Sequence, residues 1–113
     1  MHESTFLILT ALAGQPLHGY GVVQAVEELS AGDVKLRPGT LYGALDRLVE
    51  QRLIDVDREE VVDGRLRRYY RLTEAGAVAL RAWAERLRRH ATAAETQLGK
   101  RLGGALDSGT VIA

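Results

Sequence analysis

The chain has 113 residues, of which 46% are hydrophobic and 27% charged, and its formal net charge is zero. These values fit one soluble globular domain with a small core. The chain has no cysteine, which excludes disulfides and thiol chemistry and fits a reducing, cytoplasmic location, and its apolar runs are shorter than the ~20 residues that a membrane span needs.

The first third of the chain predicts two helices. Apolar residues form a broad helical face over residues 4–13, with Ser4 as a candidate N-cap, so this helix should be buried on more than one side. The Gly-Gln-Pro sequence at 14–16 ends it. A second, amphipathic helix is expected over residues 18–30.

Residues 38–52 predict a third helix with a sharply defined start. Pro38 suits the first helical turn, and Leu41, Leu45 and Leu48 recur at helical spacing. The short run at 34–36 is a candidate to pair with the edge of a later sheet.

Two alternating runs after this helix predict a β-hairpin. Pairing Ile54 with Leu72 and Val56 with Tyr70 keeps the apolar side chains on one face, and Tyr70 then belongs to the core. This register predicts a three-residue loop at 62–64. A two-residue Asp-Gly turn would shift the pairing by one residue and break the apolar face, so the longer loop is favoured.

A long final helix is expected to start after Thr73, its N-cap. Apolar and small residues then recur at alternating steps of four and three, which is a heptad seam that should pair with a second copy of the chain. Phe6 and Leu9 of the first helix are expected to complete that interface. The residues of the seam are Leu80, Ala84, Leu87, Ala91, Ala94 and Leu98.

Together these elements predict an α+β fold that is mostly α. Three helices followed by a hairpin indicate a winged helix-turn-helix over residues 1–72. A dimerisation helix is expected over 73–100 and a flexible tail over 101–113.

Three blocks in this chain resemble the signature blocks of PadR-like transcriptional regulators. They are PLHGY at 16–20, PGTLYGALDRL at 38–48 and GRLRRYYRLTEAG at 64–76. The resemblance covers about residues 5–98 and implies a homodimeric winged-helix repressor of the short form, whose single C-terminal helix makes the dimer. Arg52 stands where the family usually has a glycine that ends the recognition helix, so we expect this helix to run slightly further.

This resemblance makes double-stranded DNA the expected partner. A recognition helix presents its N-terminal residues to base edges in the major groove, and wing arginines suit phosphates or a narrow minor groove. Zero net charge counts against DNA binding, but residues 1–34 hold four acids and no Lys or Arg, so the remainder is net positive. The candidate DNA-binding residues are Lys35, Arg37, Pro38, Gly39, Thr40, Tyr42, Arg47, Gly64, Arg65, Arg67 and Arg68.

Each of these assignments has a plainer alternative. Tyr42 is alternatively a half-buried packing residue, and Arg47 a solvated side chain. The wing arginines are alternatively neutralised across the ladder by Asp57, Glu59 and Glu60. The zero net charge also leaves open a protein-interaction module on a winged-helix fold that does not bind DNA.

Some relatives bind planar aromatic compounds at the dimer centre, on a tryptophan of the last helix. The resemblance therefore implies a small aromatic effector, with Phe6, Trp83 and Leu87 as candidate pocket residues, although Trp83 alternatively anchors the last helix to its own domain. No cofactor, catalytic residue or metal site is expected, because the three histidines are dispersed and nothing resembles a catalytic constellation. The chain is therefore predicted not to be an enzyme.

Overall fold

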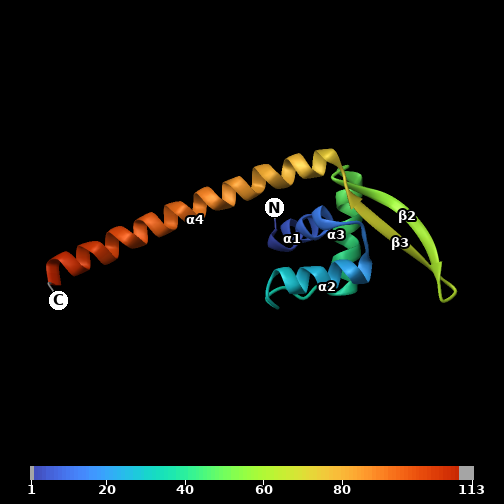
Figure 1. Cartoon of the computed structure of the whole chain (residues 1–113), viewed down its shortest axis with the longest axis horizontal. Coiled ribbons are helices and arrows are strands. Elements are labelled where there is room, and N and C mark those ends of the chain that lie inside the picture. Colours follow the sequence, from blue (N-terminus) through green and yellow to red (C-terminus); the bar gives the residue numbers. More distant parts are fainter. Residues whose placement is uncertain (1, 110–113) are drawn as a thin grey trace. The chain divides into compact units, whose positions relative to one another are not determined.

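The computed structural model describes residues 2–109, and the chain divides after Arg81 into two compact units. The first unit is a winged helix-turn-helix followed by the start of a long helix, which confirms the predicted fold class (Figure 1). Along the chain the elements are α1 (Glu3–Gly14), β1 (Leu17–His18), α2 (Gly19–Leu29), α3 (Pro38–Glu50), β2 (Ile54–Val62), β3 (Arg65–Leu72) and α4 (Glu74–Gly109).

The core lies between the three short helices and the base of the hairpin. Each helix contributes the face that its apolar spacing predicts, and the sheet adds its first inward residues. The predicted burial of Tyr70 is confirmed. The buried side chains are Ile8, Leu9, Ala11, Leu12, Val22, Val26, Leu41, Ala44, Leu45, Leu48, Ile54 and Tyr70.

Two predicted helix ends differ in the structure. α1 begins at Glu3 with His2 as its N-cap, and no side chain caps it, so the prediction of Ser4 as N-cap is wrong. An acid at Glu3 instead complements the helix dipole in the first turn.

The prediction that Arg52 extends α3 is also wrong. The helix ends at Glu50, and Arg52 takes a left-handed conformation with φ of 63°. Its N–H donates to the carbonyl of Val49 over 2.9 Å, and the N–H of Leu53 donates to that of Leu48 over 3.0 Å. These two bonds close the helix end in a left-handed conformation that glycine normally adopts. In this chain an arginine adopts it instead.

The sheet has the strand order β1-β3-β2, and its third strand is not the one predicted. β1 pairs antiparallel with β3, Leu17 opposite Tyr70 and His18 opposite Tyr69. Residues 34–36 form no strand, which makes the prediction for them wrong. The N–H of Val34 is held by the Ser30 hydroxyl oxygen at 2.9 Å, which ties this segment to the end of α2.

The hairpin contains two features that require different pairing registers, the Asp-Gly turn and the apolar pairs at its base, and the structure accommodates both. The pairs Ile54–Leu72 and Val56–Tyr70 form as predicted, but Val62 pairs with Arg65, so the predicted three-residue loop is wrong. The turn is the two-residue Asp63-Gly64, with φ of 53° and 77° as a type I′ turn requires. An irregularity between Val56 and Arg58 absorbs the one-residue shift, as a β-bulge does, and the inner apolar pairs survive.

The junction between the wing and α4 is tightly built. Thr73 caps α4 as predicted, because its hydroxyl oxygen accepts the N–H of Gly76 at 2.9 Å. The same hydroxyl lies 2.8 Å from the carbonyl oxygen of Arg52. A Cβ at Gly76 would collide with the carbonyl oxygen of Leu53 and lie 2.7 Å from Leu72 Cδ1, so only glycine fits there.

α4 continues as a helix to Gly109, through the part of residues 101–109 where the sequence suggested a tail. Lys100, Arg101 and Leu102 are good helix formers, which favours this continuation. Residues 110–113 of the expected tail lie outside the described residues.

Candidate nucleic-acid interface

The start of α3 is open to solvent. Arg37 is the N-cap and makes no side-chain capping bond, and Pro38 occupies the first turn. Leu41 and Leu45 anchor the opposite side of the helix in the core. The first-turn N–H groups therefore lie at an exposed helix start with no capping side chain, a geometry that suits an anion.

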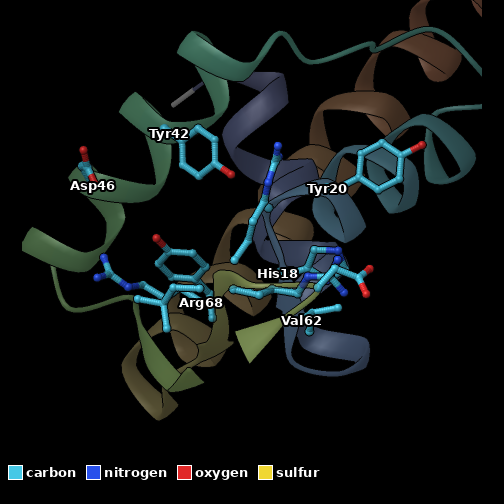
Figure 2. Close-up of a pocket in the computed structure, with 12 residues that line it drawn as sticks. His18, Tyr20, Tyr42, Asp46, Val62 and Arg68 are labelled. Carbon is cyan, nitrogen blue, oxygen red and sulfur yellow. The ribbon is translucent and has the colours of Figure 1, made fainter. Parts of the chain in front are cut away.

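Tyr42 projects from α3 between this helix and the wing (Figure 2). Its side chain is 50% exposed. A Cβ at Gly19 would lie 2.6 Å from the Tyr42 hydroxyl oxygen, so the ring tip rests on the backbone at the start of α2. Tyr42 is thus packed and also presents a surface to solvent.

Ion pairs neutralise part of the wing. Arg68 pairs with Glu59 at 3.0 Å, and Arg71 pairs with Asp55 through two bonds of 2.6 and 3.3 Å. The Arg71 hydrogen bond lowers the pKa of Asp55 below its usual value, so this pair stays ionised. These pairs are exposed, so solvent screens their charges and they contribute little to stability.

Arg65 and Arg67 differ from their neighbours on β3. In the described part of the chain, the ion pairs of the wing engage Arg58, Arg68 and Arg71 but neither of these two. Arg65 stands beside the turn and is exposed, and Arg67 is half-buried. Arg65 lies opposite Val62 across the ladder, whereas Arg67 lies opposite Glu60 and helps to lower the pKa of that carboxyl without forming an ion pair with it. Of the two, Arg65 is thus the more available to an external anion.

A stack of side chains supports the outer face of the sheet. The Arg58 guanidinium lies 3.9 Å from the centre of the Tyr69 ring, and the His18 ring meets Tyr69 edge-on at 5.3 Å. Burial lowers the pKa of His18 below its usual value, and the Arg67 cation lowers it further. His18 is therefore neutral at pH 7, and it joins β1 to the wing.

A cleft of about 750 Å³ lies between the helices and the wing (Figure 2). We call it the α3–wing cleft. Of the predicted DNA-binding residues, it brings together Tyr42 and three wing arginines, so residues from two distant parts of the sequence share one concave surface. Its lining residues are His18, Gly19, Tyr20, Tyr42, Asp46, Val62, Asp63, Arg65, Leu66, Arg67, Arg68 and Tyr70.

The other predicted DNA-binding residues lie outside this cleft. Arg47 borders a separate small cavity with His2 and Thr5 at the start of α1. Its guanidinium also approaches Gly43, where an added Cβ would lie 3.5 Å from the Arg47 Nη1 atom. The remaining six are exposed, at the entrance to α3 and at the turn: Lys35, Arg37, Pro38, Gly39, Thr40 and Gly64.

Several lining residues were not predicted as site residues. His18 is the last residue of β1, and Tyr20 lies in the first turn of α2. Figure 2 shows both across the cleft from Asp46. Asp46 is one helical turn after Tyr42, so the helical period could have placed both on one face. Leu66 is one residue of the alternating pattern of β3, and nothing in the sequence alone marks it as a site residue.

The residues predicted for a dimer interface fall into two groups. Leu9 is 0% exposed inside its own unit, so it has no surface to offer a partner, whereas Phe6 is half-buried. On α4, Leu80, Trp83 and Ala84 are half-buried. The rest of the seam is exposed, namely Leu87, Ala91, Ala94 and Leu98.

Residues 2–109 contain neither a cluster of metal ligands nor a helix that could span a membrane. No group of three or more His, Asp or Glu side chains is placed to hold a metal ion. None of the helices described is both long and apolar enough to cross a bilayer.

The family model described as "Transcriptional regulator PadR-like family" matches residues 8–82. The chain is 45% identical over 73 residues to the transcriptional regulator Rv3488 of Mycobacterium tuberculosis, covering 65% of this chain and 64% of that protein. It is 35% identical over 103 residues to the transcriptional regulator YqjI of Escherichia coli, covering 91% of this chain and 46% of that protein. The chain thus spans less than two thirds of the length of either relative.

Solved structures share the fold. A PadR family transcription regulator from Clostridium difficile matches with a TM-score of 0.73 at 25% identity, over 87% of this chain and 100% of that chain. Bacillus subtilis PadR, crystallised in complex with operator DNA, matches with a TM-score of 0.63 at 22% identity, over 71% of this chain and 46% of that chain. At 22% identity this second likeness concerns the fold alone.

Proposed function

Because the chain belongs to the PadR-like family of transcriptional regulators, we propose that it binds double-stranded DNA in a sequence-specific manner, as a homodimeric repressor acting in the cytoplasm. The family is one of regulators and not of enzymes. The observation that carries the proposal is the α3–wing cleft, where Tyr42 meets Arg65 and Arg67 on one concave surface. The operator complex of the B. subtilis relative supports the same kind of partner.

In this proposal α3 and the wing have different tasks. Thr40 and Tyr42 near the start of α3 read base edges in the major groove, and the open helix start with Lys35 and Arg37 holds a phosphate. Arg65 and Arg67 contact the backbone or the adjacent minor groove, and a phosphate there would compete with Glu60 for Arg67, since Glu60 lies opposite Arg67 across the ladder. Arg68 joins them only by exchanging Glu59 for a phosphate, because the two are paired at 3.0 Å in the free protein.

The dimer is proposed to form through α4. Leu87, Leu98 and Leu102 are 42%, 57% and 62% exposed on this helix, and an apolar stripe of that kind indicates a partner. Two copies related by a two-fold axis would present two recognition helices to a palindromic operator. Its half-sites would lie one DNA turn apart, ~34 Å, or a multiple of it.

An aromatic effector at the dimer centre is the part of the proposal that rests on the family resemblance. Trp83 is the sole tryptophan of the chain, so its fluorescence reports on that site without interference from another. Quenching by a planar aromatic compound, together with release from DNA, is the expected result. If no such compound quenches the fluorescence or weakens DNA binding, this part is refuted.

A protein-interaction module is the second candidate function. It is favoured by the ion pairs of Arg58, Arg68 and Arg71, which reduce the positive charge of the wing, and by the zero net charge. Such a module would show no salt-dependent binding to duplex DNA, whereas phosphate contacts make binding fall steeply with salt.

The experiment that tests the proposed function separates base readout from backbone contact. We would measure the affinity of Thr40→Ala and Tyr42→Ala variants for a selected duplex and for a scrambled one, with wild type as reference. Loss of a base contact should lower the specificity ratio about 10-fold, since such contacts contribute ~1–3 kcal/mol, and leave scrambled binding unchanged. Equal weakening on both duplexes would count against base readout by α3.

A further inference from the structure

The helix α3 carries an acidic side chain on the surface that borders the α3–wing cleft. Asp46 is exposed and lines this cleft together with Tyr42, which lies one helical turn before it (Figure 2). The neighbouring Leu45 is fully buried, so the packing of the helix holds Asp46 on the side away from the core. An acid therefore lies on the same surface as a residue proposed to read bases.

Asp46 differs from the acids of the wing in having no partner. Each of the wing acids forms an ion pair with an arginine of the hairpin, namely Asp55, Asp57, Glu59 and Glu60. The side chain of Asp46 forms neither an ion pair nor a hydrogen bond with any of residues 2–109. Its carboxylate is therefore available to a hydrogen-bond donor from outside the chain.

Asp46 does not stabilise the helix that carries it. Aspartate is among the poorer residues for a helix interior, because its side chain competes for backbone hydrogen bonds. Glu50 is exposed one turn later, so two acids repel each other at a spacing of four residues. A residue that weakens its own element without gaining a contact is typical of a functional position.

A glycine one turn before Asp46 leaves the surface of α3 bare. An added Cβ at Gly43 would meet only the flexible end of the Arg47 side chain, at 3.5 Å. Packing among the described residues thus does not require a glycine here, although glycine weakens a helix interior. The missing side chain does allow another molecule to approach the helix backbone closely. The short side chain of Asp46 needs such an approach to reach a partner.

The chemistry of a carboxylate restricts what it can recognise in DNA. An ionised carboxylate only accepts hydrogen bonds, so it repels phosphates and adds nothing to the attraction of the backbone. In the major groove cytosine presents its N4 amino group, which is a donor, whereas guanine presents two acceptors and thymine one. A carboxylate is therefore satisfied by cytosine and opposed by guanine and thymine.

We propose that Asp46 accepts a hydrogen bond from the N4 amino group of a cytosine in each half-site and so selects a C·G pair there. This inference rests on the proposed function and deepens it, because it adds to Thr40 and Tyr42 a third reader whose base is specified. Asp46 contributes selectivity more than affinity, since its charge opposes every duplex that lacks a donor at that position.

The test combines binding-site selection with affinity measurements on the full chain. The wild type, Asp46→Ala and Asp46→Asn each select duplexes from the same random pool. Glu50→Gln is the matched control, because it removes an acid from the same helix at a position that does not line the cleft. Thermal unfolding checks that each variant is folded, which we expect because Asp46 has no partner among residues 2–109 to lose.

Sites selected by the wild type should contain cytosine at one fixed position of each half-site. Replacing that C·G pair by T·A should weaken wild-type binding about tenfold per half-site, and this discrimination should disappear in Asp46→Ala. Asp46→Ala should accept any base pair at that position and leave the rest of the site unchanged. Asp46→Asn should prefer adenine, because an amide can both donate to and accept from its edge. Glu50→Gln should select the wild-type site.

Three results would overturn the inference in distinguishable ways. If Asp46→Ala selects the wild-type site and still discriminates C·G from T·A, Asp46 reads no base, while the proposed function stands. If Glu50→Gln relaxes the same position equally, the loss of charge and not a base contact is responsible. If the wild type enriches no duplex at all, the proposed function fails, and this inference fails with it.

Discussion

The salt dependence of DNA binding gives a quantitative test of the wing. The perturbation is Arg65→Ala combined with Arg67→Ala, the two wing cations that have no ion-pair partner among residues 2–109. If each neutralises one phosphate, the slope of log affinity against log salt becomes shallower by ~0.9 per contact, or ~1.8 per bound protomer. Between 50 and 200 mM salt, this corresponds to ~12-fold less loss of affinity per protomer. For the proposed dimer the slope changes by ~3.6, and the variant should lose ~150-fold less affinity than the wild type does.

The assay is fluorescence anisotropy with a labelled duplex at four or more salt concentrations. Arg71→Ala is the matched control, because it removes the same charge from the same face of β3. Arg71 is held by Asp55 through bonds of 2.6 and 3.3 Å at the base of the wing, so it should change the slope little. A double variant with the wild-type slope, or an equal change from Arg71→Ala, would refute the assignment of phosphate contacts to the wing tip.

Three further predictions concern stability. Gly76→Ala should lower the free energy of unfolding by roughly 2–3 kcal/mol in chemical denaturation, because its methyl group would collide with the Leu53 carbonyl, and a wild-type midpoint would contradict that packing. Arg52→Gly should raise it by up to ~1 kcal/mol, since glycine takes a φ of 63° without strain, and a loss of stability would show that the arginine side chain matters there. The lowered pKa of His18 means that the folded chain binds this proton less readily than the unfolded chain, so stability should fall as the pH drops through ~6.5. This fall should shrink in His18→Gln and in Arg67→Ala, and an unchanged pH profile in both would contradict it.

Much of this fold follows from local patterns in the sequence. The helical spacing of Leu41, Leu45 and Leu48 identifies the buried face of α3, and these side chains are buried as that spacing requires. Thr73 followed by an acid predicts the start of α4, and its hydroxyl does accept the N–H of Gly76. The position and the buried face of a helix can therefore be predicted where its own sequence carries regularly spaced apolar residues or a capping residue.

The wrong predictions concern the hairpin loop and the end of α3, where the local conformation depends on residues outside the segment itself. The Asp63-Gly64 turn and the apolar pairs at the base of the wing demand registers that differ by one residue, and only the bulge after Val56 reconciles them. An arginine in the place of the family's helix-ending glycine predicts a longer helix, but the hydrogen bonds of Leu53 and Thr73 hold the backbone of Arg52 in a left-handed conformation.

The candidate site could be predicted only in part. Clustered arginines in the sequence point to the wing, but their pairing with acids across the ladder separates Arg68 from Arg65 and Arg67, and this depends on the register. Likewise, Asp46 and Leu66 share a cleft because α3 packs on β2, the strand that pairs with β3, and no periodicity within one element reveals this arrangement.

The most direct test of DNA recognition by this chain is a binding-site selection with the purified protein on a pool of random duplexes. Our proposal predicts an enriched site with two symmetric half-sites, centred ~34 Å apart or at a multiple of that distance. A pool that emerges without any enriched sequence, or one enriched for a single half-site bound by one copy of the chain, would contradict it.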